Sequence, residues 1–122
     1  MQPNRIILTT LAHVPAKTRF ISAEPLIDEV DFSVEQALLD SFHWCIIGGE
    51  SGNKTGKYQY RECKLEWIEK IMADLSDTNV AVFVKQMGGY LRNELKLMYK
   101  KGGDIDEWPA HLQVRDYPVK GL

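Results

Sequence analysis

The chain has 122 residues, of which 44% are hydrophobic and 26% are charged. This length and composition are typical of one globular domain with its own core, and they exclude a disordered chain. Fifteen basic and seventeen acidic residues give a net charge of −2, so the bulk charge does not support nucleic acid as a partner.

The first third of the chain predicts a helix, a strand and a second helix. Apolar residues at three-to-four spacing indicate a helix over Pro3–Val14, which the next proline ends. A β-prone run over Thr18–Ala23 predicts a short strand. The second helix is expected over Ser33–Asp40, because Ser33 and Gln36 have the spacing of a capping box.

The rest of the chain continues this alternation. The apolar run Phe42–Ile47 predicts a second strand, and Val80–Val84 predicts a third. Between them, an apolar stripe predicts a helix over Glu62–Leu75. A further helix is expected to begin near Leu91 and to end at Gly102-Gly103.

Strands that are joined through helices run parallel, which predicts an α/β fold. We expect a single domain over residues 1–122, with an irregular tail over residues 104–122 that Trp108 anchors. Because the second and third strand runs are apolar almost throughout, helices are expected to cover both faces of the sheet. Three strands leave two unpaired edges, so either the tail holds a further strand or another chain supplies the missing ones.

Neither a membrane span nor a metal site is indicated. No apolar stretch approaches the roughly 20 residues that cross a bilayer, and no secretory signal is recognisable, so we expect a soluble, cytoplasmic protein. Cys45 and Cys63 are the only cysteines, fewer than a zinc or iron–sulfur site requires, so no metal is expected. Cys45 is expected in the core. Cys63 is expected either to be a buried, inert thiol or to be made more acidic by the start of a helix.

Polar residues follow the predicted strands at their carboxyl ends. Because parallel strands end at the same edge of a sheet, these residues are expected to meet at one rim and to bind a polar or anionic substrate. The alternative is that they are ordinary loop residues, which are usually polar. With one arginine from the start of the following helix, the candidate substrate-binding residues are Glu24, Gly48, Gly49, Glu50, Ser51, Arg61, Lys85 and Gln86.

Several of these candidates have two possible roles. The glycine-rich segment Gly48–Gly52 is either a loop that brings a ligand close to the backbone or a structural turn, and its spacing excludes a P-loop. Lys85 is either a partly buried base or the partner of Glu24 or Glu50 in a rim salt bridge. Arg61 either holds an anionic ligand or is a solvated loop residue.

The histidines and two of the tryptophans are assigned no chemistry. His13, His43 and His111 have neither a nucleophile partner nor the spacing of metal ligands. Trp44 and Trp67 are expected to contact the core. The pattern therefore identifies no catalytic residue.

Motifs at the predicted strand ends and in the tail occur in a specific order. They are Ser22-Ala23-Glu24-Pro25-Leu26, Trp44–Gly52, Tyr60-Arg61-x-Cys63, Val82–Gly88, Gly102-Gly103-Asp104-x-x-Glu107-Trp108-Pro109, Leu112-x-Val114-Arg115 and Tyr117-Pro118. Together they cover nearly the whole chain. In this order they resemble a family of uncharacterised phage-type proteins that look like radical SAM barrels.

The resemblance implies that the chain is the carboxyl-terminal half of a (β/α) TIM-type barrel, which agrees with the missing strands. Members of that family carry, near their amino end, cysteines of the kind that hold a [4Fe–4S] cluster and cleave S-adenosylmethionine. This chain lacks them, so both cofactors are expected only together with an amino-terminal half-barrel. The family's polar rim maps to the candidate residues given above.

Two function classes remain open at this stage. In the first, the chain is the substrate-side half of a radical-SAM-like enzyme, and its partner is the amino-terminal half. In the second, it is a non-catalytic binding or assembly module that self-associates through exposed sheet edges.

Overall fold

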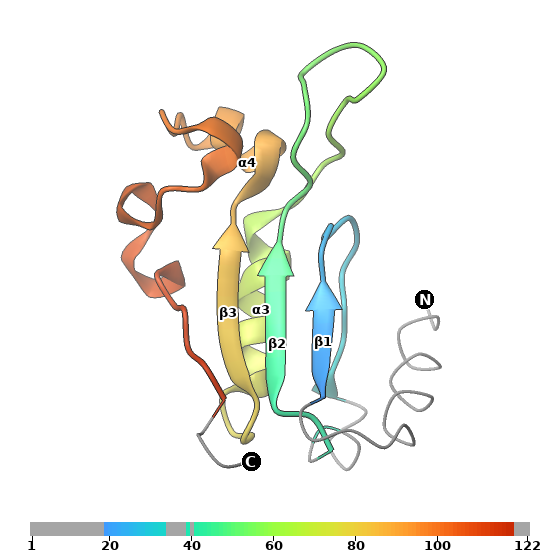
Figure 1. Cartoon of the computed structure of the whole chain (residues 1–122), viewed down its shortest axis with the longest axis vertical. Coiled ribbons are helices and arrows are strands. Elements are labelled where there is room, and N and C mark those ends of the chain that lie inside the picture. Colours follow the sequence, from blue (N-terminus) through green and yellow to red (C-terminus); the bar gives the residue numbers. More distant parts are fainter. Residues whose placement is uncertain (1–18, 34–38, 40, 119–122) are drawn as a thin grey trace.

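A computed structural model describes residues 19–33, 39 and 41–118. Within them, parallel strands form a three-stranded sheet in the order β1-β2-β3 (Figure 1). The strands are β1 (Phe20–Ala23), β2 (Trp44–Gly48) and β3 (Ala81–Gln86). The prediction of an α/β fold with parallel strands is therefore confirmed. The predicted helix over Pro3–Val14 and most of the one over Ser33–Asp40 lie outside the described residues.

Helix α3 (Leu65–Leu75) connects β2 to β3 and explains why these strands run parallel. Its apolar stripe is fully buried at Ile68, Ile71 and Leu75. The helix begins three residues later than the sequence predicts. None of the helices within the described residues is long and apolar enough to cross a bilayer.

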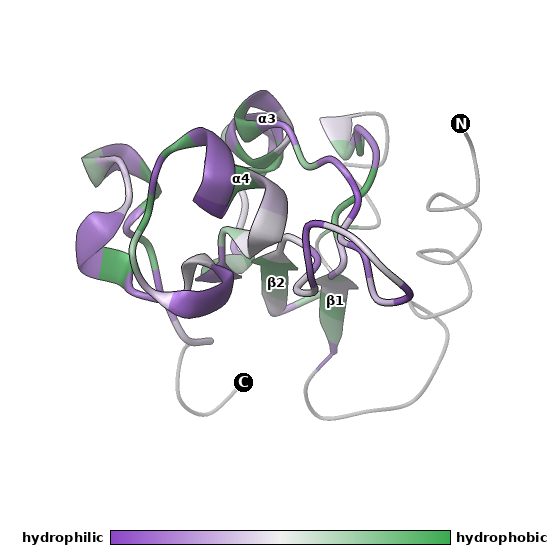
Figure 2. Ribbon diagram, turned by 90° about the horizontal axis from the view of Figure 1, so that it is seen from above, coloured by the Kyte–Doolittle hydropathy of each residue, from purple (hydrophilic) through white to green (hydrophobic). Residues whose placement is uncertain are grey.

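Within the described residues, a helix covers only one face of the sheet, whereas the apolar strand runs predicted helices on both faces. Burial alternates along β2: Cys45 and Ile47 are fully buried, whereas Trp44 and Ile46 are only partly buried. Figure 2 shows α3 on one side of the strands. We call the second face, on which the other half of the residues in this apolar run lie, the open face. The run predicted two covered faces because its apolar residues lie on both.

Helix α4 (Gly88–Glu94) begins earlier than predicted and ends well before Gly102. The chain leaves the helix through Lys96, whose φ of 56° does not continue a right-handed helix. Beyond it, a 3-10 turn at Lys100–Gly102 replaces the end of the predicted helix, and the predicted irregular tail contains 3-10 turns at Ile105–Glu107 and Ala110–Leu112.

The end of the tail lies along the outer edge of β3. Arg115 forms an isolated antiparallel bridge with Phe83, and the amide of Val84 donates to the carbonyl of Val114 over 2.9 Å. The tail therefore pairs with this edge by a bridge but adds no regular strand. Trp108 anchors the tail as predicted: it is 3% exposed, and its indole N–H donates to the carbonyl of Gly102 over 2.9 Å.

Candidate functional site

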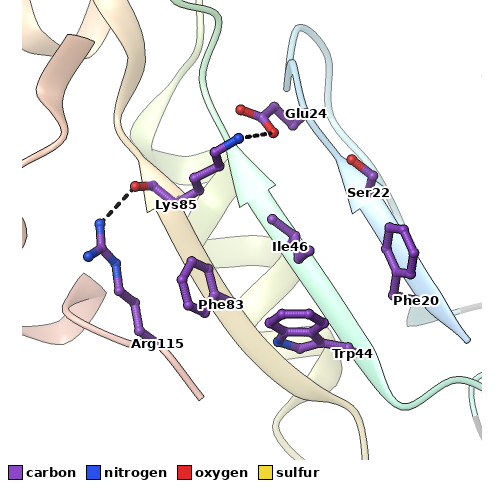
Figure 3. A pocket seen from close by; sticks show the side chains of 8 residues that line it. All are labelled: Phe20, Ser22, Glu24, Trp44, Ile46, Phe83, Lys85 and Arg115. Atoms are coloured by element: carbon purple, nitrogen blue, oxygen red, sulfur yellow. Dashed lines mark hydrogen bonds and ion pairs between the residues drawn. The ribbon is translucent and has the colours of Figure 1, made fainter. Parts of the chain in front are cut away.

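The open face carries a pocket of about 530 Å³ to which all three strands contribute (Figure 3). Its side chains form rows across the sheet, because Phe20 pairs in register with Trp44, and Ile46 with Phe83. These rows are mainly apolar. The charged residues Glu24, which follows β1, and Lys85, near the end of β3, lie beyond them toward the carboxyl ends of the strands. The pocket is lined by Phe20, Ser22, Glu24, Trp44, Ile46, Phe83, Lys85 and Arg115.

The carboxylate of Glu24 is the centre of the polar end of the pocket. It accepts a hydrogen bond from Lys85 Nζ over 3.3 Å at one oxygen, and from Gln86 Nε2 over 3.2 Å at the other. The amide of Gln86 is 5% exposed and also donates to the carbonyl of Gly49 over 2.9 Å. Gln86 thus links the residue that follows β1 to the loop that follows β2. The structure brings these predicted rim residues together.

Lys85 forms a salt bridge with Glu24, one of the two roles considered for it. Its side chain is 52% exposed, so it lacks the burial by which a lysine becomes a base. An ammonium has three N–H donors, and this one gives a single hydrogen bond to a side chain or carbonyl of the described residues. Lys85 is therefore a charged donor with capacity for a ligand.

Because Gly48 has no side chain, the Glu24 carboxylate can lie directly beside it. A Cβ on Gly48 would lie 3.1 Å from Oε2 of Glu24, closer than an ordinary van der Waals contact. The amide of Leu26 donates to the carbonyl of Gly48 over 2.8 Å, which holds the chain after Glu24 against the end of β2. Gly48 therefore contributes to the site by its lack of a side chain.

Glu50 and Arg61 form a separate pair, and this corrects the expectation that both join the rim. Nε and Nη2 of Arg61 donate to the two carboxylate oxygens of Glu50 over 2.9 and 2.6 Å, and the Arg61 backbone N–H donates over 2.9 Å. These hydrogen bonds hold the pKa of Glu50 below its ordinary value. The pair closes the loop between β2 and α3, and neither residue lines the pocket. Ser51 is exposed in the same loop.

Arg115 is a pocket residue that the sequence analysis did not select. Its Nε donates to the carbonyl of Val84 over 3.0 Å, and its Nη2 donates to that of Lys85 over 2.8 Å. The guanidinium carbon lies 5.5 Å from the centre of the Phe83 ring and 5.1 Å from that of Trp108. No carboxylate of the described residues pairs with it. The pocket lining therefore carries two cations and one carboxylate, and its net charge is positive.

The aromatic floor of the pocket was also missed. Trp44 was expected to contact the core, but its ring lies on the open face and meets the Phe83 ring edge-on at 5.7 Å. The signal was available, because alternate residues of a strand share a face. Counting back in steps of two from Lys85 gives Phe83, and from Glu24 it gives Ser22 and Phe20. Trp67, by contrast, packs against the core as expected.

The two cysteines do not fit a metal or cluster. Cys45 and Cys63 are both buried, and burial raises the pKa of each thiol to about 12. Cys63 precedes α3 instead of lying in its first turn. The described residues contain no group of three or more histidine, cysteine or acidic side chains that could hold a metal ion. A [4Fe–4S] cluster therefore finds no ligand set among them.

The two described histidines have structural partners. Nδ1 of His43 accepts from the backbone N–H of Arg19 over 3.0 Å, and Nε2 of His111 lies 2.6 Å from Oε2 of Glu69. The first contact joins the residues that precede β1 and β2, and the second ties the tail to α3. His13 lies outside the described residues.

Comparison with known proteins gives one match. Residues 3–111 match a family described as protein of unknown function, DUF5131. No curated protein matches the chain, and no solved structure matches it.

Proposed function

The chain belongs to the DUF5131 family of proteins of unknown function, and we propose that its strand-end rim binds a small polar or anionic molecule. The observation that carries this proposal is the convergence of Lys85 and Gln86 on Glu24, because Glu24 and Lys85 line the pocket and the buried Gln86 holds the carboxylate beside it. Membership of the family supplies no activity, so the proposal depends on the geometry of this site.

The polar end of the pocket has the features of a recognition site. Gln86 is buried and fixed at Gly49, so it holds the Glu24 carboxylate in one orientation. Lys85 is half-exposed and has free donor capacity, which suits an acidic group of a ligand. Binding sites of α/β proteins commonly lie at the carboxyl ends of parallel strands.

We also propose that the three strands are the carboxyl-terminal half of a (β/α) barrel. The open face supports this, because the inward side chains of a barrel are mainly apolar and its polar site residues lie at the carboxyl ends of the strands. To close a barrel, strands of the other half would join at both edges of the sheet, beside β1 and beside β3, where the tail makes one isolated bridge. In this arrangement, the cluster and S-adenosylmethionine chemistry of radical-SAM-like enzymes would belong to the other half.

The binding proposal is tested with acetate and inorganic phosphate as probes. In an NMR titration of the wild type, we expect either anion to shift the side-chain amide signals of Gln86. In Lys85→Ala, neither anion should shift them. The matched control is Lys54→Ala, because Lys54 is exposed and does not line the pocket. Unchanged Gln86 signals in the wild type, or equal shifts in Lys85→Ala, would overturn the proposal.

The open face favours a second candidate, a non-catalytic assembly module. Phe20 is 52% exposed and lies beside other partly exposed apolar side chains. Sedimentation over a hundredfold range of concentration tests this candidate. A dimer that dissociates in Phe20→Ser and still forms in Glu24→Gln would support assembly, whereas a monomer at every concentration would overturn it.

A further inference from the structure

We propose that the pocket on the open face takes a flat aromatic anion, with its ring on the aromatic floor and its acidic group at Lys85. This inference rests on the proposed function, because it names the ligand class of the same site. It adds a requirement for a ring and a requirement for negative charge.

The floor of the pocket provides the surface for a ring. The exposed edge of Phe20, the partly buried rings of Trp44 and Phe83, and Ile46 between them all lie on the same face (Figure 3). Tyr117 packs against Trp44 and Phe83 with ring centres 5.6 and 5.5 Å away. Aromatic pairs prefer such tilted and edge-on contacts, so the floor offers a ligand ring contacts of the kind that its own rings already make.

The charges of the lining favour an anion over a cation. Lys85 lies at the strand-end side of the floor, and Arg115 lies at its β3 side (Figure 3). The guanidinium is oriented by the carbonyls of Val84 and Lys85, which carry no net charge to balance it. Glu24 neutralises only one of the two cations, and it can accept a hydrogen bond from a donor group on the ligand ring.

The size of the pocket agrees with this class. A volume of about 530 Å³ lies within the range of sites that bind small organic molecules. Glu24 and Lys85 stand at one end of the pocket and the apolar surface at the other, with Arg115 along the β3 side (Figure 3), so an occupant needs a similar division into an acidic end and an apolar body. A flat ring with an acidic group at one end has this division, whereas a small inorganic anion leaves the floor uncovered.

The experiment compares 2-naphthoate, 2-naphthalenemethanol, 2-naphthylmethylamine and acetate as probes. The indole N–H signal of Trp44, assigned with Trp44→Phe, reports on the floor, and the side-chain amide of Gln86 reports on the rim. We expect 2-naphthoate to bind about tenfold more tightly than the alcohol, which is the lower range for a hydrogen bond to a charged group, and also more tightly than the amine, which has the opposite charge, and acetate, which has no ring. In Lys85→Gln its advantage over the alcohol should disappear, and in Lys54→Gln it should persist.

The outcomes separate this inference from the proposed function. If acetate shifts the Gln86 amide and 2-naphthoate binds no more tightly, the aromatic requirement is wrong and the rim proposal stands. If the amine or the alcohol binds as tightly as 2-naphthoate, the requirement for negative charge is wrong. If no probe shifts either signal, both proposals fall.

Discussion

Gly49 and Gly88 pack backbone against backbone where the loops after β2 and β3 meet. A Cβ on Gly49 would lie 2.1 Å from the carbonyl oxygen of Met87, and one on Gly88 would lie 2.6 Å from the carbonyl carbon of Gly49. The amide of Gly89 donates to the carbonyl of Glu50 over 2.9 Å at the same junction. This contact fixes the Gly49 carbonyl, which in turn orients Gln86 in the site.

Gly49→Ala should therefore destabilise the fold strongly. The added methyl group overlaps backbone that cannot move without separating the two loops, and we expect a loss of about 3 kcal/mol in the free energy of unfolding. The control is Gly56→Ala, because Gly56 has a φ of 95° and no atom within 4 Å of an added Cβ. Strain alone should cost this variant about 1 kcal/mol. Urea denaturation measures both, and equal losses would contradict the close-packing explanation.

Close packing at the same junction explains why the start of α4 could not be predicted from the sequence. Gly88 and Gly89 have low helix propensity, so the pattern indicates a helix only from Leu91. The structure needs glycine there because a Cβ on Gly89 would lie 2.3 Å from the ring of Tyr60. This requirement comes from residues far away in the chain, and local propensity does not contain it.

Arg61→Ala should raise the pKa of Glu50 and reduce stability only where Glu50 is charged. In the folded protein, hydrogen bonds from Arg61 lower the pKa of Glu50 from its ordinary value of 4.5. The pair therefore stabilises the fold above pH 4.5, and this contribution is lost as the pH falls through the lowered pKa. We expect the small difference in urea midpoint between wild type and Arg61→Ala at pH 7 to shrink as the pH falls below 4.5.

A carbon-detected NMR titration of the Glu50 carboxyl gives the direct measurement. Its pKa should be lower in the wild type than in Arg61→Ala. Glu50→Gln is the control, because its urea midpoint should show no dependence on Arg61 at either pH. An identical Glu50 titration in both proteins would show that the pair does not persist in solution.

The candidate site was predictable in part. The convergence of Glu24, Lys85 and Gln86 follows from the rule that parallel strands end at one edge, and the structure brings these three together. The pairing of Glu50 with Arg61 was not predictable, because it depends on how the loop between them folds back. Arg115 belongs to the tail, and its place in the pocket follows only from the antiparallel bridge to Phe83.

Trp108→Ala should detach the tail from the sheet. Trp108 is buried, and its ring lies under the guanidinium of Arg115, so its removal leaves a cavity and releases the arginine. We expect a loss of about 3–5 kcal/mol in the free energy of unfolding. Amide exchange should accelerate at Val84 and Asp116, whose N–H groups bond across the tail and β3.

Trp108→Phe distinguishes the contribution of the buried ring from that of its hydrogen bond. This variant keeps much of the buried ring and loses the bond to the Gly102 carbonyl, which retains the amide of Met87 as a partner over 3.0 Å. We expect a loss of only about 1 kcal/mol and slow exchange at Val84. If Trp108→Ala leaves that exchange unchanged, the anchor is not what holds the tail on β3.

Both thiols should be unreactive in the native protein. Cys45 and Cys63 are 0% and 1% exposed, and burial raises the pKa of each to about 12, helped at Cys63 by the negative charge of Glu62. Because the thiolate is the reactive form, neither should reduce Ellman's reagent at pH 8 until urea unfolds the chain, when two equivalents should react. Ser51→Cys is the control, since its exposed loop position should give one rapid equivalent. One rapid equivalent in the native wild type would contradict this prediction, because it would show that one thiol is accessible at the surface. Cys63, which precedes α3, would be the first candidate.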